Sequence, residues 1–189
     1  MVDSDKSNEL MSQIVSYPQS SFLIRLAEGD SLMTGVHVFQ TLVNERSQNG
    51  VYISCNANSP YNFLENYFSA YNIDLSRVFF IDAVTNTLLD KKVSNKNNVV
   101  FTSGPIMRES LAKLKQFLSV NKNISFVYFD SLTELLKYHT EDEIQDFLAN
   151  LMNLTKEKGM TGLVLSFHGE REANLVKSIT KYCDHFLDL

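Results

Sequence analysis

Two patterns of apolar residues alternate along this chain. Short apolar runs rich in Val, Ile and Phe are separated by longer segments in which apolar residues recur every three or four positions. The short runs are typical of strands buried on both faces, and the longer segments of amphipathic helices. Their alternation predicts βα units that build a mostly parallel sheet. The predicted strands are residues 22–27, 51–54, 78–83, 99–102, 124–130, 162–167 and 185–189.

Several helices carry recognisable start signals. Thr140 and Glu143 form a capping box, and the apolar stripe that follows ends at Gly159. At 59–60 and 104–105, Ser-Pro and Gly-Pro predict an N-cap followed by proline at the first helical position. A short polar helix is predicted over 8–17, further apolar stripes over 111–118 and 175–182, and an exposed loop over 91–98. The stripes are explained by core packing alone.

Length and composition favour one folded domain. At 189 residues, with 44% apolar and 21% charged residues, the chain can bury a central sheet. Residues 1–20 are predicted to be a short helical extension and residues 21–189 the main domain. Seventeen basic against 22 acidic residues give a net charge of −5, so nucleic acid is not an expected partner. No leader pattern or membrane-spanning run is evident, which favours a cytoplasmic protein without a membrane partner.

The cysteines, histidines and serines do not have the sequence spacing typical of metal sites or of catalytic nucleophiles. Cys55 and Cys183 lie beside apolar runs, far apart in the sequence, which favours buried thiols over a disulfide. The four histidines lack metal-ligand spacing, and no serine lies in a G-x-S-x-G elbow. We therefore predict no metal, no cofactor and no serine hydrolase.

The segment 22–43 has the strand, loop and helix order of a phosphate-binding loop. Such a loop reads G-x-x-x-x-G-K-[ST], in which backbone N–H groups surround the phosphates, lysine neutralises their charge and the hydroxyl binds Mg²⁺. Gly29 occupies the first glycine position. Thr34 stands at the second glycine position, Gly35 at the lysine and Val36 at the hydroxyl. Three of the four defining positions are therefore changed.

Downstream segments add a family resemblance. Residues 50–54, the helix that ends in Asn72-Ile73-Asp74-Leu75, and residues 78–83 follow in the order of the KaiC family's second strand, helix and third strand. Residues 126–136, an apolar strand that ends in Asp130 and continues Ser-Leu-Thr-Glu-Leu-Leu, resemble its Walker B segment. With the last two strands, the resemblance covers residue 22 to the C-terminus. It implies a three-layer α/β/α sandwich with a mostly parallel central sheet, the RecA/KaiC-like P-loop NTPase fold.

Departures from that family point to lost catalysis. The family has a pair of water-activating glutamates after its second strand, where this chain has Cys55, Asn56, Ala57 and Asn58. Lysine, hydroxyl and carboxylates, which position and stabilise the transferred phosphoryl group, are thus missing together. The resemblance then implies a pseudo-ATPase, with a degenerate Walker A motif, that works as a regulatory or signal-transduction module binding a protein partner. Without nucleotide between subunits, it should be a monomer or a small nucleotide-independent oligomer.

Other interpretations stay open at this stage. The chain could be a nucleotide-binding protein or slow ATPase in which Arg25, Lys91 or a residue of a partner subunit replaces the missing lysine. Alternatively, the chain could be an enzyme of unrelated chemistry that uses the cleft at the carboxyl edge of the sheet, because a fold does not determine its function. Asp130 is either a vestigial Walker B carboxylate or a strand end that accepts backbone hydrogen bonds at Ser131, with a lowered pKa. Asp82 is interpreted as structural.

One helix also offers a surface for a partner. The aromatic residues of the segment 61–71 fall on more than one helix face, so that some can be buried while others protrude. The set consists of Tyr61, Phe63, Tyr67, Phe68 and Tyr71.

Overall fold

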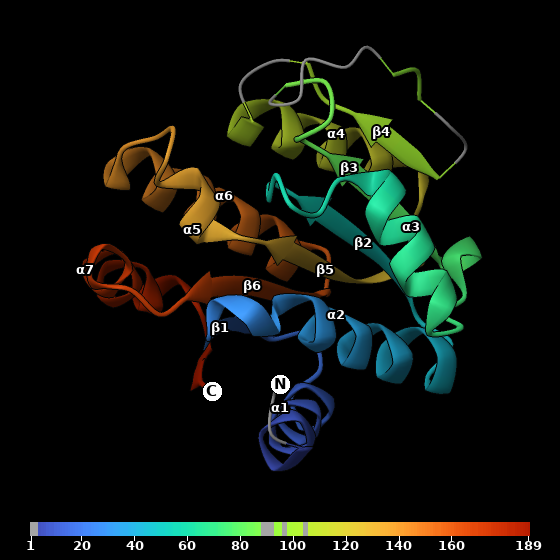
Figure 1. Ribbon diagram of the computed structural model, residues 1–189, viewed down its shortest axis with the longest axis horizontal. Coiled ribbons are helices and arrows are strands. Elements are labelled where there is room, and N and C mark those ends of the chain that lie inside the picture. Colours follow the sequence, from blue (N-terminus) through green and yellow to red (C-terminus); the bar gives the residue numbers. More distant parts are fainter. Residues whose placement is uncertain (1–3, 88–92, 96–97, 104–105) are drawn as a thin grey trace.

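The computed structural model describes residues 4–87, 93–95, 98–103 and 106–189 and contains a seven-stranded parallel sheet (Figure 1). The strand order is β4-β3-β2-β5-β6-β1-β7, and every neighbouring pair is parallel. All seven predicted strands are confirmed, with ends that differ by at most two residues. They are β1 (Ser21–Leu26), β2 (Asn49–Ser54), β3 (Val78–Asp82), β4 (Val99–Phe101), β5 (Ile124–Asp130), β6 (Thr161–Phe167) and β7 (His185–Asp188).

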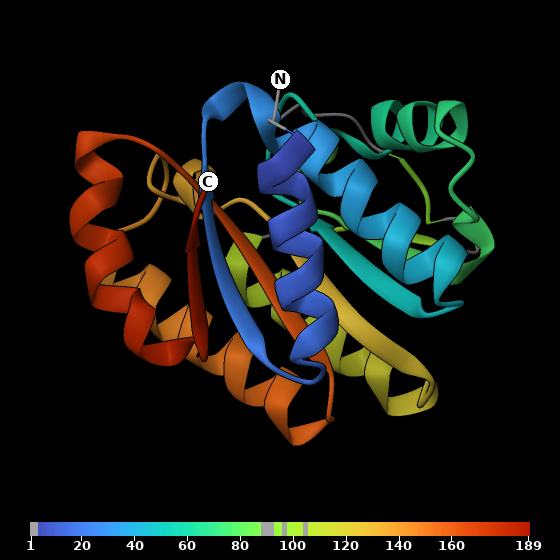
Figure 2. The ribbon, with the colours of Figure 1, turned by 90° about the horizontal axis from the view of Figure 1, so that it is seen from below.

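Helices cover both faces of the sheet (Figures 1 and 2). The first three helices contribute to the apolar core on one face, and the other four to the core on the opposite face. This arrangement confirms the predicted three-layer α/β/α sandwich. The helices are α1 (Ser4–Ser16), α2 (Ser31–Phe39), α3 (Tyr61–Ala70), α4 (Ile106–Val120), α5 (Leu132–Leu135), α6 (Glu141–Glu157) and α7 (Glu170–Ile179), with a π-helical extension of α2 at Gln40–Glu45 and 3-10 turns at Glu28–Asp30, Leu75–Arg77 and Thr180–Tyr182.

The central strands explain why their sequences read as continuous apolar runs. Successive side chains of a strand point to opposite faces, and here both faces are covered by helices. In β5, Phe126 and Tyr128 enter the core beneath α2, whereas Val127 and Phe129 enter the core beneath α6. All seven residues of β6 are buried. Alternation of apolar and polar residues is therefore absent from these strands.

Two of the helix starts test the predicted capping signals. At α6 the capping box is confirmed, because Thr140 Oγ1 accepts from the Glu143 N–H and the Glu143 carboxylate accepts from the Thr140 N–H at 2.9 Å. At α3 the prediction of a Ser59 cap was wrong: Pro60 holds the cap position, and the Tyr61 N–H donates to Asp82 Oδ2 at 2.8 Å. The start predicted at 104–105 lies outside the described residues.

The N-terminal helix packs against the sheet-covering layer. Leu10 and Ile14 of α1 are buried in the core that contains α2 and α3. The helix occupies Ser4–Ser16, somewhat earlier than the predicted 8–17. Within the described part of the chain, no helix is both long and apolar enough to cross a membrane. In the predicted loop 91–98, Ser94 and Asn95 are exposed, while residues 91, 92, 96 and 97 are not described.

Candidate functional site

The carboxyl edge of the sheet is where a ligand would be expected. In open α/β sheets, ligands bind where neighbouring strands lead to helices on opposite faces. Here β2 leads to α3 on one face, whereas its neighbour β5 leads to α5 and α6 on the other. The ends of β2, β3 and β5 meet at this point, since Ser54 is the register partner of both Asp82 and Asp130.

The chain after β1 turns into a helix almost at once. Four residues, 27–30, separate β1 from α2, and three of them form a 3-10 turn. Gly29 is exposed within this turn, whereas Thr34, Gly35 and Val36 all lie inside α2 and are buried. Helical N–H groups donate to carbonyls four residues earlier, so those of Gly35 and Val36 are engaged within the helix. The four predicted positions are not brought around a common space.

Gly35 lies against the aromatic core in this arrangement. A Cβ at this position would lie 3.5 Å from the Tyr128 Oη and 3.8 Å from the Phe68 ring. These are ordinary van der Waals distances, so a methyl group would fit here and the packing does not require glycine. Thr34 is only 2% exposed, and its hydroxyl has no hydrogen-bond partner among the described residues.

Asp130 ends β5 in an environment of aromatic side chains. It is 1% exposed, and its Oδ2 accepts a hydrogen bond from Tyr52 Oη at 2.8 Å. Its Oδ1 has no partner among the described residues. Burial raises the pKa of Asp130 to about 6, against the lowering effect of the Tyr52 bond, and the nearby Glu134 carboxylate raises it further.

The prediction that Asp130 accepts backbone hydrogen bonds and has a lowered pKa was therefore wrong. The turn that follows, with a cis peptide bond between Asp130 and Ser131, does not direct its N–H groups at this carboxylate. A buried carboxylate with one hydroxyl donor is poorly solvated, so burial dominates its pKa. Chemically, this group can take up a proton near neutral pH.

Asp82, not Asp130, accepts the backbone hydrogen bonds of a strand-end turn. Its carboxylate accepts from the backbone N–H groups of Tyr61, Val84 and Thr85, each at 2.8 Å, and from the Thr85 hydroxyl at 2.6 Å. These bonds join the end of β3 to the start of α3 and to the turn after the strand. The interpretation of Asp82 as structural agrees with this geometry.

Two tyrosines near Asp130 were not singled out in the sequence. Tyr52 and Tyr128 are register partners in β2 and β5, and both are buried. Burial raises the pKa of each well above the usual value, and the Asp130 carboxylate adds to the effect. The Tyr128 hydroxyl, like Oδ1 of Asp130 and the Ser131 hydroxyl, has no partner among the described residues. A tyrosine within an otherwise aliphatic and phenylalanine-rich strand is the signal that could have identified them.

Comparison with known proteins defines the fold. No protein-family model and no curated protein matches this sequence. Among solved structures, the KaiC-like protein of the hyperthermophilic archaeon Pyrococcus horikoshii superposes with a TM-score of 0.63 at 13% identity, covering 91% of this chain and 72% of that protein. The fold is that of KaiC-like, RecA-type proteins. In this fold, β1 is followed by a short turn and α2, the strand, loop and helix order that the sequence predicted, and β5 ends in Asp130.

The segment after β2 has no carboxylate. Asn56 Oδ1 accepts from the Asn58 N–H at 2.9 Å, and the Ser54 hydroxyl donates to the Ser59 carbonyl at 2.7 Å. This compact turn follows β2, at the place where the sequence resemblance implied a pair of glutamates. Cys55 within it is buried, and burial raises the pKa of its thiol well above the usual value.

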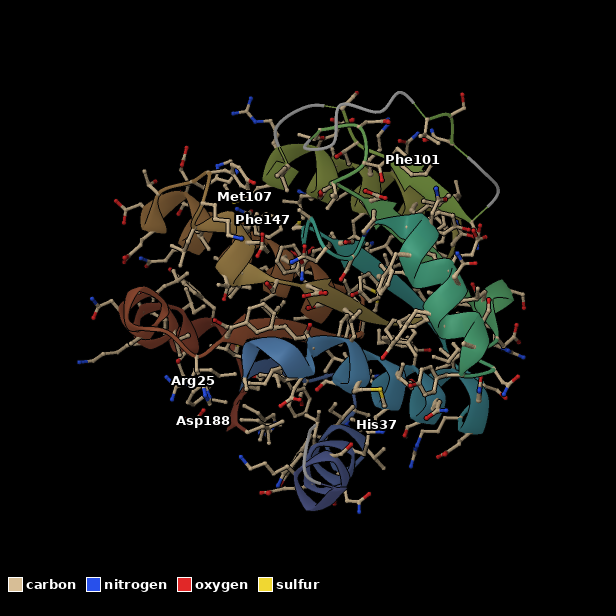
Figure 3. All side chains as sticks on the ribbon, viewed as in Figure 1. Arg25, His37, Phe101, Met107, Phe147 and Asp188 are labelled. Carbon is tan, nitrogen blue, oxygen red and sulfur yellow. The ribbon has the colours of Figure 1, made fainter. Side chains whose placement is uncertain are left out.

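Two cationic residues, Arg25 and Lys91, were considered as replacements for the missing lysine of the phosphate-binding loop. Arg25 donates through Nε to Asp188 at 2.9 Å and also contacts it through a second guanidinium nitrogen (Figure 3). His168 Nε2 lies 2.9 Å from the same carboxylate. Lys91 lies outside the described residues. Across the described residues, no group of three or more His, Cys, Asp or Glu side chains could hold a metal ion.

Proposed function

We propose that this chain is a non-catalytic domain with a KaiC-like fold that does not bind Mg-ATP and acts as a regulatory or signal-transduction interaction module. One observation carries the proposal. Thr34, Gly35 and Val36 are buried residues within α2. They stand at the positions that would supply the second glycine, the lysine and the hydroxyl of a phosphate-binding loop. A phosphate cannot be surrounded by N–H groups that already donate within a helix.

The charge of this segment adds support. Residues 26–45 contain no lysine or arginine, while Glu28 and Asp30 flank Gly29. A triphosphate brought to this segment would find no lysine or arginine to neutralise its charge. Phosphoryl transfer depends mainly on positive groups placed around the phosphates, and the sequence supplies none here.

The interaction role is supported by a surface on α3. Phe63, Tyr67 and Tyr71 follow one another at four-residue intervals, and their rings are in contact at centroid distances of 5.6 Å and 5.2 Å. Phe63 is 40% exposed, and the Tyr67 hydroxyl lies 3.2 Å from the Met33 sulfur of α2. Tyr61 and Phe68, from the same helix, are buried. Exposed aromatic and methionine side chains are enriched at protein interfaces.

Light scattering coupled to gel filtration tests the proposal. The mass should be that of a monomer or small oligomer and should be the same with and without Mg-ATP, because no nucleotide would join neighbouring subunits. Magnesium with inorganic phosphate serves as the control for salt effects on elution. A larger ring that forms only with Mg-ATP would contradict the proposal.

A further inference from the structure

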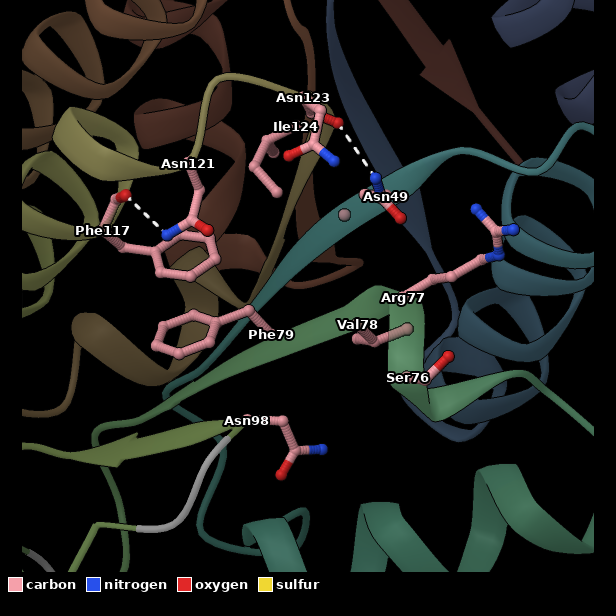
Figure 4. A pocket seen from close by; sticks show the side chains of 11 residues that line it. Asn49, Ser76, Arg77, Val78, Phe79, Asn98, Phe117, Asn121, Asn123 and Ile124 are labelled. Carbon is pink, nitrogen blue, oxygen red and sulfur yellow. Dashed lines mark hydrogen bonds between the residues drawn. The ribbon is translucent and has the colours of Figure 1, made fainter.

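A pocket of about 250 Å³ lies at the amino edge of the sheet, at the opposite end of the strands from Asp130 (Figure 4). It is bordered by the starts of β2, β3 and β5, by the end of α4, and by the residue before β4. Four asparagines line it: Asn49, Asn98, Asn121 and Asn123. They are spread over the sequence from 49 to 123, so only the fold brings them together.

Protein contacts orient the side-chain amides of two of these asparagines, Asn49 and Asn121, and leave hydrogen-bonding capacity for a ligand. Asn49 donates through Nδ2 to the Asn123 carbonyl at 3.2 Å, and Asn121 through Nδ2 to the Phe117 carbonyl at 3.0 Å (Figure 4). Asn98 Oδ1 lies 3.3 Å from the Tyr61 hydroxyl, whose proton is donated to Glu65 at 2.6 Å. The amides of Asn49 and Asn121 therefore each have the NH₂ end held by the protein, while the Oδ1 acceptor at the other end has no protein partner among the described residues.

A pair of aromatic rings forms the apolar wall. Phe79 of β3 and Phe117 of α4 stack with centroids 3.7 Å apart and an interplanar angle of 9°. Both rings are only partly buried. In Figure 4 the Asn121 amide lies beside the Phe117 ring, so the amide groups and the aromatic wall border the same space. Such a wall favours offset or edge contacts with another planar group.

The charge of the lining argues against an ionic ligand. Arg77 is the charged residue among those that border the pocket, and its guanidinium already donates to Asp74 Oδ2 at 3.2 Å and to the Ser47 carbonyl at 2.9 Å. No carboxylate belongs to the lining. Binding pockets for drug-sized ligands begin at about 300 Å³, so this one suits a smaller molecule.

We propose that this amino-edge pocket binds a small, uncharged, planar molecule that carries amide-type donors and acceptors, such as a free nucleobase or a carboxamide of an aromatic ring. The asparagine amides would pair with the ligand's polar edge, and the Phe79–Phe117 pair would contact its ring. The proposal is independent of the function proposed for the opposite edge, because it uses no residue of α2 or of the Asp130 surroundings.

Amide NMR spectra of the full chain titrated with uracil test this inference. Uracil should shift the side-chain NH₂ signals of Asn49 and Asn121 saturably, with a Kd of about 1 mM or tighter. Orotate, the same ring with a carboxylate, should bind at least about fivefold more weakly, since the pocket offers its charge no free cation. No saturable shift with uracil, or equal or tighter binding of orotate, would overturn the proposal.

A matched pair of variants locates the site. Asn121 and Asn150 each donate through Nδ2 to the carbonyl four residues earlier, at 3.0 Å and 2.7 Å, but Asn150 lies in the groove between α4 and α6. Asn121→Leu should weaken uracil binding about fivefold, the value of one hydrogen bond, and Asn150→Leu should not. Asn49→Leu provides a second variant if Asn121→Leu unfolds. An equal effect of Asn150→Leu would place binding elsewhere and refute the assignment.

Discussion

Asp82 and Asp130 end the two strands that flank β2, and both are register partners of Ser54. Asp82 accepts four hydrogen bonds, three of them from backbone N–H groups. Asp130 accepts one from a tyrosine and has an unpartnered oxygen within the described structure. Both β3 and β5 are apolar runs that end in aspartate. The carboxylate at the end of β3 is surrounded by hydrogen-bond donors, whereas the one at the end of β5 is poorly solvated. The groups around each carboxylate, and not the strand that carries it, therefore determine what the aspartate does.

The largest effect should come from Asp82. The variant Asp82→Asn replaces an acceptor-only carboxylate by an amide whose NH₂ faces the donors of Tyr61, Val84 and Thr85. Unsatisfied buried donors should lower the free energy of unfolding by about 3 kcal/mol. Urea unfolding at neutral pH measures this loss. A loss no larger than that of Asp130→Asn would remove the distinction between the two aspartates.

Asp130→Asn should have the opposite sign. The pKa of about 6 lies above the usual 3.8, so the folded state binds the proton more tightly than the unfolded chain. The resulting stability is fully present below the unfolded pKa and is lost as pH rises through about 6. The difference between the folded and the usual pKa corresponds to about 3 kcal/mol of stability. The variant, which carries no charge, should lack this loss and be more stable than the wild type at neutral pH.

Unfolding free energies at a series of pH values check that prediction. The gap between Asp130→Asn and the wild type should widen from acid to neutral pH. Parallel curves for the two proteins would mean that Asp130 keeps an ordinary pKa in the folded state, and they would contradict this prediction.

A third strand-end carboxylate, Asp188 of β7, should show the smallest effect. Hydrogen bonds from Arg25 and, more weakly, from His168 lower the pKa of Asp188 to about 2, but its side chain is 44% exposed. Its stabilisation is present above the unfolded pKa and is lost as pH falls through about 2. Because solvent screens the pair, Asp188→Asn should cost about 0.5 kcal/mol at neutral pH, and less in high salt. A loss as large as that of Asp82→Asn would contradict this ordering.

The fold was predictable because it depends on local patterns. Strands buried on both faces appear as apolar runs, and the Thr140–Glu143 capping box marks a helix start within four residues of sequence. The cap of α3 was not predictable in the same way, since its acceptor is Asp82, which lies 21 residues from Tyr61. Local signals identify elements, whereas contacts between elements need the tertiary structure.

The candidate site shows the same limit more clearly. The sequence indicated that Thr34, Gly35 and Val36 lack phosphate-binding groups, but it did not show that α2 begins at Ser31 and includes them. The packing of Gly35 against Tyr128, and the burial that raises the pKa of Asp130, depend on helices laid across the sheet. The asparagines of the amino-edge pocket read in sequence as ordinary turn residues.

Calorimetric titration of the purified chain with Mg-ATP tests the central claim most directly. The account predicts no saturable heat at nucleotide concentrations up to about 1 mM, because the N–H groups of Gly35 and Val36 are engaged within α2 and residues 26–45 contain no lysine or arginine to neutralise the phosphates. Saturable binding with a Kd in the micromolar range would contradict it and would mean that this edge of the KaiC-like fold still holds a nucleotide.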